Sequence, residues 1–184
     1  KEVRNNFREA AKNVSNYLRQ HKIKNVILLD ASARPLWIAI KMTNPDVKIH
    51  FLHPEKTIKE LKKERKELVN LIQRERVAVI DDFMEKGTTM KKVMRRLRKL
   101  GGKDIHAIVF GLLSPEVPID EKVFIGKQGL KSIERISPWY WYFDAKGVEE
   151  IDGTRDLISL KEKDQVRLIR ALREEIKRVL ETKD

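Results

Sequence analysis

Apolar positions divide most of the chain into short continuous runs and longer helical stripes. Four stretches have the pattern of buried strands: 26–29, 47–52, 77–80 and 105–110. Apolar residues at helical spacing lie before, between and after them, in the stretches 3–18, 36–40, 57–74, 90–100 and 166–180. Strands that alternate with helices in this order predict an α/β fold, with a parallel sheet flanked by helices.

The regular alternation stops near residue 112, where Pro and Gly begin to break the chain into short pieces. We expect one domain over residues 1–184, with no internal repeat. Its core is predicted at about 22–111, a small subdomain of loops and strands at about 112–158, and a final amphipathic helix at about 160–182. The small subdomain is expected to lie over the carboxyl ends of the strands, where ligands bind in such sheets.

The composition narrows the class of protein. The chain has 184 residues and no cysteine, which excludes disulfides and Cys-based metal sites and fits a reducing compartment such as the cytoplasm. No apolar run is long enough to span a bilayer, and no signal peptide is evident, so we expect no membrane partner. Dense Lys, Arg and Glu without Cys is typical of a thermophile. The net charge of +12 suits a nucleic acid or a phosphorylated metabolite, although a solvated basic face would explain it too.

The stretch after the third predicted strand carries the clearest chemistry. Asp81 and Asp82 follow the strand 77–80, where we expect them outside the core, and a short loop then leads to Gly87, Thr88 and Thr89 at the start of a helix. Backbone N–H groups, a hydroxyl and a helix N-terminus suit a phosphate monoester. The carboxylates suit sugar hydroxyls or a divalent cation. The alternative is a strand end with solvated aspartates and a capped helix.

A second loop with similar potential joins the first predicted strand to the helix at 36–40. It contains small residues and one cation, in the order Asp30, Ala31, Ser32, Ala33, Arg34 and Pro35. Its backbone N–H groups are placed to meet an anion. It is equally compatible with a simple connector in which Arg34 forms a surface salt bridge.

The stretch Val77–Thr89 resembles the phosphoribosyl-pyrophosphate (PRPP) binding motif of type I phosphoribosyltransferases. That motif is an apolar run, two acidic residues, three variable positions, then Thr or Ser, Gly, any residue, and Thr or Ser. Asp81 and Asp82 match the acidic pair, Gly87 the glycine and Thr89 the last hydroxyl, whereas Lys86 replaces the first hydroxyl. The arrangement of residues 26–110 also resembles the family's core, and residues 112–158 its variable hood.

The resemblance implies Mg²⁺-dependent transfer of the phosphoribosyl group of PRPP to a nucleobase, with release of pyrophosphate. Asp81 and Asp82 would then hold the ribose hydroxyls. The 5′-phosphate would be bound by Glu85, Lys86, Gly87, Thr88 and Thr89. The pyrophosphate would be bound by Ala31, Ser32, Ala33 and Arg34 together with Mg²⁺. The candidate metal ligands are Asp81, Asp82 and the hood residue Asp144.

The resemblance is closest to the 6-oxopurine branch, which implies purine salvage. Glu85 occupies the position of an acidic residue that lies near the purine ring in that branch, so it is the catalytic candidate. Trp139 and Trp141 are candidates to stack on the base, although an aromatic cluster of this kind also suits the hood's own core or a dimer contact. No Lys within the strand up to Phe110 is available to recognise a 6-oxo group. We also expect a homo-oligomer, a dimer.

A non-catalytic regulator that senses PRPP and binds nucleic acid is the alternative. The net charge of +12 favours it, as does the highly charged helix predicted at 57–74, where many family members carry a mobile catalytic lid. No RNA-binding motif is present, and the aromatic residues are not interleaved with Lys or Arg, so the enzyme is our first hypothesis.

Overall fold

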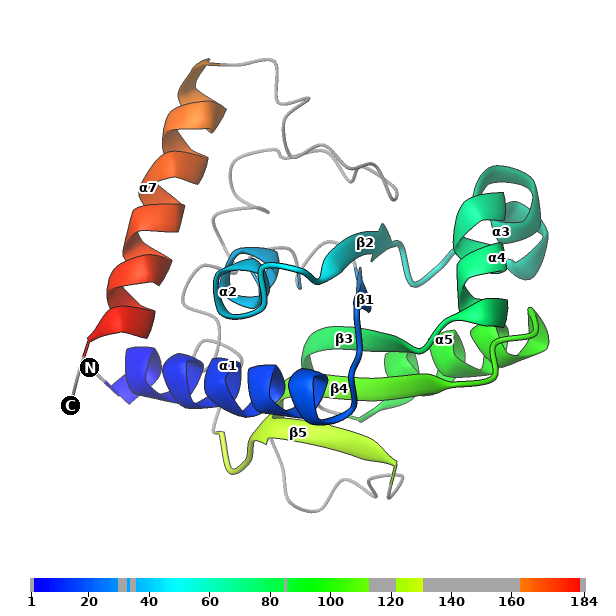
Figure 1. The fold of residues 1–184 in the computed structure, drawn as a ribbon, viewed down its shortest axis with the longest axis horizontal. Helices are drawn as coiled ribbons and strands as arrows, with labels where there is room; N and C mark the ends of the chain where they lie inside the picture. Colours follow the sequence, from blue (N-terminus) through cyan, green and yellow to red (C-terminus); the bar gives the residue numbers. More distant parts are fainter. Residues whose placement is uncertain are drawn as a thin grey trace.

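A computed structural model describes residues 2–29, 33, 36–84, 86–112, 122–130 and 163–182. Its centre is one five-stranded sheet in the order β2-β1-β3-β4-β5, with every neighbouring pair parallel. The strands are β1 (Asn25–Leu29), β2 (Lys48–Leu52), β3 (Val77–Met84), β4 (Ile105–Leu112) and β5 (Val123–Lys127). The predicted parallel sheet is confirmed (Figure 1). Strands within 112–158 were expected in a small subdomain, but β5 instead extends the central sheet as an edge strand.

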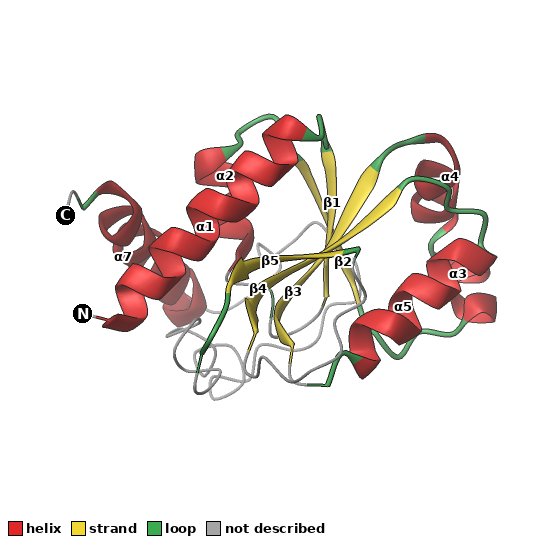
Figure 2. Cartoon of the chain, turned by 90° about the horizontal axis from the view of Figure 1, so that it is seen from below, coloured by secondary structure: helices red, strands yellow, loops and turns green. Residues whose placement is uncertain are grey.

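Helices cover both faces of the sheet. They are α1 (Glu2–Gln20), α2 (Leu36–Thr43), α3 (Ile58–Glu64), α4 (Lys66–Arg74), α5 (Thr88–Lys99) and α7 (Lys163–Glu181). Figure 2 shows α1, α2 and α7 on one side of the sheet and α3, α4 and α5 on the other. None of these described helices combines the length and apolar character needed to cross a membrane.

Two apolar cores follow from this layering. Val26 and Leu28 of β1 join the core under α1 and α2, whereas Ile27 and Leu29 join the core under α4 and α5. Successive strand residues point to opposite faces, and both faces of a covered parallel sheet are buried. This explains why β1 is a continuous apolar run rather than an alternating one.

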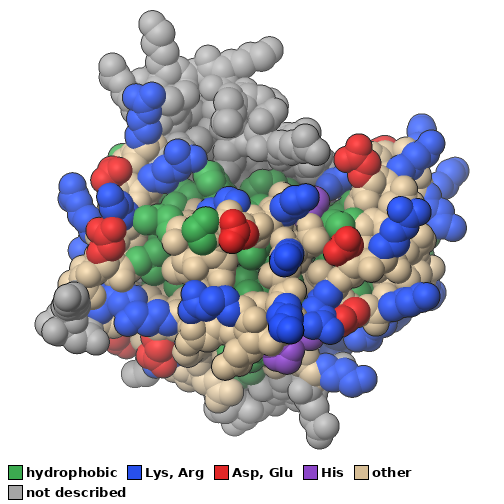
Figure 3. Space-filling view, in the orientation of Figure 1, with side chains coloured by type: hydrophobic (Ala, Val, Ile, Leu, Met, Phe, Trp, Pro, Cys, Tyr) green, Lys and Arg blue, Asp and Glu red, His purple; other side chains and the backbone are tan. Residues whose placement is uncertain are grey.

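On one face of the molecule, charged side chains of both signs are mixed (Figure 3). On the face seen in Figure 3, Lys and Arg side chains are spread widely, and Asp and Glu side chains lie between them. Ion pairs such as Lys127–Glu9 at 2.6 Å and Arg4–Glu175 at 3.0 Å belong to this mixed surface. The excess of cations therefore does not gather into one patch on this face.

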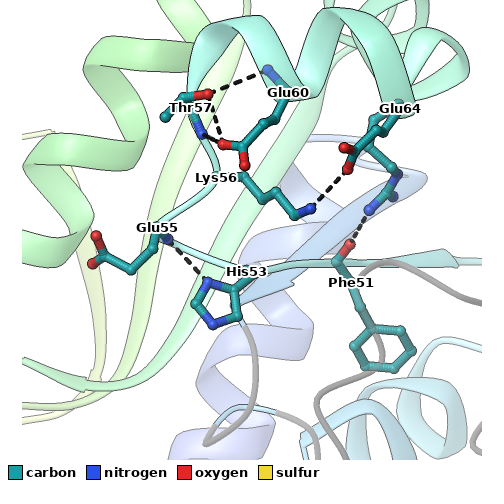
Figure 4. A network of polar contacts seen from close by, with 8 residues as sticks. Phe51, His53, Glu55, Lys56, Thr57, Glu60 and Glu64 are labelled. Carbon is teal, nitrogen blue, oxygen red and sulfur yellow. Dashed lines mark hydrogen bonds and ion pairs between the residues drawn. The ribbon is translucent and has the colours of Figure 1, made fainter.

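The single helix predicted at 57–74 is wrong, because the structure has two helices, α3 and α4, with a break at Arg65. A capping box begins α3: Thr57 Oγ1 accepts from the Glu60 N–H at 3.2 Å, and the Thr57 N–H donates to Glu60 Oε2 at 2.7 Å. At the break, Arg65 donates to the Phe51 carbonyl at 2.9 Å, and Lys56 pairs with Glu64 at 2.7 Å (Figure 4). These contacts connect the junction of α3 and α4, which we call the helical corner, to the end of β2.

A glycine allows α1 to pack closely on β5. A Cβ at Gly126 would lie 2.9 Å from the Phe110 carbonyl oxygen and 3.1–3.2 Å from side-chain carbons of Val14 and Ala10. The Asn13 side-chain amide also donates to the Gly126 carbonyl at 2.9 Å. The first helix of the chain is therefore fastened to the edge strand of the sheet.

A chain of hydrogen bonds joins α1 to the amino end of β4. Tyr17 Oη lies 2.8 Å from His106 Nδ1, and His106 Nε2 lies 2.9 Å from Asp104 Oδ1. Arg76 donates to the other oxygen of Asp104 at 2.6 Å. The hydrogen bonds from Arg76 and His106 hold the pKa of Asp104 below its usual value. A carboxylate can only accept, so His106 donates to Asp104 and accepts from Tyr17.

We expect Tyr17→Phe to lower the free energy of unfolding by about 1 kcal/mol, the usual net value of one hydrogen bond. For a chain of this size that is a fall of about 2–4 °C in Tm. The ring and its stacking on Phe124, with centroids 4.3 Å apart, are kept. Thermal denaturation followed by circular dichroism measures the change, and a variant with the parent Tm would show that the hydroxyl contributes nothing.

Candidate functional site

The predicted motif lines a cavity of about 340 Å³ at the carboxyl ends of the central strands. Its walls come from β1, β3 and β4, from the turn after β2, and from the start of α5. The lining residues are Leu29, Pro54, Asp81, Asp82, Phe83, Met84, Lys86, Gly87, Thr88, Thr89, Met90 and Val109. The acidic pair and the Gly/Thr turn are therefore brought to one cavity.

The two carboxylates lie inside the strand and not after it. β3 continues to Met84, because its pairing with β4 runs on to Phe83 opposite Gly111 and Met84 opposite Leu112. Asp81 is 9% exposed and Asp82 is 1% exposed. The expectation that the pair would lie outside the core is wrong, because β3 continues through both residues and stays paired with β4 to its end.

Burial makes this pair electrostatically costly. Asp81 Oδ1 accepts from the Asp82 N–H at 2.9 Å, and Asp82 Oδ1 accepts from the Phe83 N–H at 2.9 Å. Loss of hydration, and then the neighbouring charge of Asp82, raise the pKa of Asp81 well above its usual value. A cation or a set of hydroxyl donors in the cavity would stabilise the ionised pair.

The pair fits the way in which proteins hold Mg²⁺. That ion is usually bound through one or two carboxylates and completed by waters and phosphate oxygens of a substrate. Among the described residues no group of three or more acidic or His side chains is placed to hold a metal by itself. The described carboxylate pair is therefore suited to supply one or two of the ligands of such a cation.

The turn after β3 leaves the start of α5 open to an anion. Gly87 is the N-cap residue, in the left-handed region with φ +71°, and it has no side chain to cap the helix. The first turn of α5 contains no acidic residue, and Thr88 and Thr89 are exposed. The first N–H groups of a helix have no partner within it and carry the positive end of its dipole, so they attract an anion.

The structure describes some of the predicted site residues and not others. Asp81, Asp82, Lys86, Gly87, Thr88 and Thr89 all line the cavity. Ala33 is described, but its side chain is buried in the core and its N–H donates to the Leu29 carbonyl at 3.2 Å, so this N–H is already used. The other candidates lie outside the described residues: Ala31, Ser32, Arg34, Glu85, Trp139, Trp141 and Asp144.

Sequence reasoning missed most of the apolar lining. Leu29 and Val109 were assigned to strands, and Phe83 and Met84 to the loop after the strand 77–80, but none of them to the cavity. The last residue of the first strand could have been found, because carboxyl ends of parallel strands share one edge. Pro54 had no such signal, because its position depends on the turn that follows β2.

Comparisons with known proteins agree with this architecture. A model of the phosphoribosyl transferase domain family matches residues 7–134. A Leishmania tarentolae HGPRT in complex with GMP has 10% identity and a TM-score of 0.51, over 73% of this chain and 86% of that one. A Staphylococcus aureus hypoxanthine phosphoribosyltransferase has 13% identity and a TM-score of 0.51, over 71% and 82%. At these identities the two structures show a shared fold. No curated protein sequence matches the chain.

We expect Asp81→Asn to stabilise the folded protein at neutral and alkaline pH. Because the folded-state pKa of Asp81 is raised, its stabilising contribution is present while the carboxyl is protonated and is lost as the pH rises through that pKa. The Asn variant avoids this loss, and each gain of about 1 kcal/mol raises the Tm by about 2–4 °C. The comparison is thermal denaturation of parent and variant at pH 4 and pH 8, with Asp46→Asn on the exposed turn before β2 as the control. An equal or lower Tm for Asp81→Asn at pH 8 would contradict the expectation.

Proposed function

Because this chain belongs to the phosphoribosyl transferase domain family, we propose that it binds PRPP and transfers the phosphoribosyl group to a nucleobase, releasing pyrophosphate. One observation supports this most directly. A buried carboxylate pair and an uncapped helix N-terminus open into the same cavity of about 340 Å³. PRPP carries both groups that such a cavity would recognise, a phosphate monoester and neighbouring sugar hydroxyls.

The 5′-phosphate is proposed to bind at the turn before α5. Backbone N–H groups at Gly87, Thr88 and Thr89 and the two Thr hydroxyls would donate to its oxygens. Lys86 is exposed beside them and lines the cavity, so its ammonium group adds charge attraction where the related motif has a hydroxyl.

The ribose is proposed to bind at Asp81 and Asp82. Its hydroxyls would donate to the carboxylate oxygens, which replaces part of the hydration that burial removes. Bond breaking at the ribose carbon develops positive charge, and a negative pair nearby stabilises that charge in the transition state. The apolar walls at Leu29, Phe83 and Val109 help to keep water from the reacting centre.

Mg²⁺ is proposed to bind together with PRPP, with the carboxylate pair as its protein ligands. When bound, the ion would neutralise charge on the departing pyrophosphate. Asp144 as a further ligand, and the pyrophosphate loop Ala31–Arg34, remain proposals that rest on the family resemblance. Because the Ala33 N–H is used by Leu29, the loop would have to offer its other N–H groups, or rearrange, to hold an anion.

The acceptor is proposed to be a purine, with Glu85 exchanging a proton with the base and Trp139 or Trp141 stacking on it. Incubating the protein with PRPP, Mg²⁺ and a panel of purine and pyrimidine bases, followed by mass spectrometry, tests both the reaction and the base. Formation of a purine nucleotide supports the proposal. Full turnover in Glu85→Gln would remove the proposed role of Glu85, since loss of one proton-transfer group usually costs about 10²–10⁴-fold.

A PRPP-sensing regulator that binds nucleic acid is the second candidate. The observation that favours it is the helical corner of α3 and α4, at the position of the family's mobile lid. This corner is held by the Arg65–Phe51 hydrogen bond and the Lys56–Glu64 ion pair. PRPP binding without any nucleotide product, across all the bases tested, would favour the regulator.

We expect Gly87→Ala to abolish the thermal stabilisation that PRPP and Mg²⁺ give to the parent. A ligand at 100 times its Kd stabilises the folded state by about 2.7 kcal/mol. A Cβ at Gly87 would be strained at φ +71° and would lie 3.1 Å from Met84 Sδ, so the turn that presents the N–H groups must shift.

Gly129→Ala is the matched control, because Gly129 also has a positive φ, +73°, but a Cβ there would meet nothing within 4 Å. Both variants should lose some stability through backbone strain. Only Gly87→Ala should lose the PRPP-dependent shift in Tm. A shift that persists in Gly87→Ala would place the phosphate elsewhere.

A further inference from the structure

A second and larger hollow lies on the other flank of α5. Its volume is about 570 Å³, and we name it the α5 groove. It is lined by Met84, Gly87, Met90, Lys91, Met94, Arg95, Arg98, Lys99, Ile105, Ala107, Lys122 and Val123. The groove therefore runs along α5 and is closed on its other side by the beginnings of β4 and β5.

The charge in this groove has one sign. Lys91, Arg95, Arg98 and Lys99 are exposed along α5, and Lys122 lies across from them. No Asp or Glu is among the described residues that line the groove. Within the part of the chain that the structure describes, the side chains of the four α5 cations form no ion pair or hydrogen bond. A concave surface of one sign concentrates oppositely charged ligands.

The cations on the other flank of α5 do have protein partners, so the lack of a partner is not common to all cations of this helix. Lys92 forms an ion pair with Glu55. Arg96 donates to the Pro54 and Lys56 carbonyls at 2.6 and 3.0 Å. The α5 cations that face the helical corner bind protein groups. The four α5 cations that face the groove have no such partner among the described residues and are available to bind a ligand.

The floor of the groove is apolar. Met90 and Met94 are buried beneath the cations, and Ile105 and Val123 are half-buried at the strand side. The volume lies within the range of about 300–1,000 Å³ that is usual for small-molecule sites. An anion with an apolar, flat part therefore fits better than inorganic phosphate alone.

We propose that the α5 groove binds a nucleoside di- or triphosphate, with its phosphates on the Lys and Arg rows and its base over the apolar floor. Arg is suited to phosphate because its guanidinium group donates two parallel hydrogen bonds. The row Lys91, Arg95, Lys99 spans about 12 Å at the helical rise of 1.5 Å per residue, the length of one nucleotide rather than of a strand. Among the described residues that line the groove, none is aromatic and able to stack successive bases of a nucleic acid.

The groove shares a wall with the candidate PRPP cavity. Met84, Gly87 and Met90 line both hollows. A nucleotide in the groove therefore contacts the back of the turn that is proposed to bind the 5′-phosphate. Binding of one ligand should change the affinity for the other, and by the same factor in both directions. Occupancy of the groove is measured directly and does not depend on PRPP binding.

The experiment is isothermal titration calorimetry with ATP and GTP in Mg²⁺ buffer at fixed salt. We expect one site in the parent and a loss of at least tenfold in affinity in Arg95→Ala/Arg98→Ala. The matched control is Arg74→Ala/Arg170→Ala, which removes two exposed Arg residues outside the groove and should stay within about twofold of the parent, since surface substitutions usually have small effects. Thr89→Val alters only the PRPP cavity and should also leave the affinity unchanged.

Four results would overturn the proposal. No binding of either nucleotide would remove it, and an equal loss in the control pair would reduce it to general charge attraction. A large loss in Thr89→Val would assign the nucleotide to the PRPP cavity. Tighter binding of a twelve-residue oligouridylate, with a steeper dependence on salt, would assign the groove to nucleic acid. Tripolyphosphate, which has the phosphates but no base, tests the role of the apolar floor. An affinity for it equal to that for ATP would show that the base contributes nothing.

Discussion

The burial of two adjacent carboxylates in the central strand is the constraint on which the rest of the site depends. Asp81 and Asp82 are almost fully covered, yet they lie in a strand paired on both sides at its start and with β4 to its end. A protein tolerates such a pair only where something outweighs its cost, and in folded proteins perturbed carboxylates concentrate at functional sites. The surrounding apolar walls and the uncapped helix fit that interpretation.

The start of α5 lies close to this carboxylate pair because few residues separate them in the sequence. Only a short turn separates Asp82 from Gly87, so the helix N-terminus and the carboxylates must share one edge of the sheet. The same helix then separates two hollows whose chemistry differs. One combines acidic residues with an open helix end, and the other combines exposed cations with an apolar floor.

Most of the fold was predictable because β1 and the stretches 77–80 and 107–110 of β3 and β4 are continuous apolar runs, as is typical of strands covered on both faces. The motif was predictable because its residues are contiguous. The break at Arg65 was not, since it depends on a side chain reaching a distant carbonyl. β5 was not predicted as part of the central sheet because a strand containing Gly126 resembles a loop in sequence. The α5 groove could not be predicted from the sequence because its lining residues come from β3, α5, β4 and β5, which lie far apart along the chain.

The fastening of α1 to β5 through Gly126 has a consequence for synthesis of the chain on the ribosome. The partner strand of the apolar stripe of α1 is synthesised only about 100 residues after that stripe. At about 5–20 residues per second, that interval lasts about 5–20 s. During this interval, Ala10 and Val14 lack their final neighbours on β5, so the nascent chain exposes the apolar stripe of α1. Until β5 has been made, the α1 stripe should therefore be a binding site for chaperones that hold nascent apolar segments.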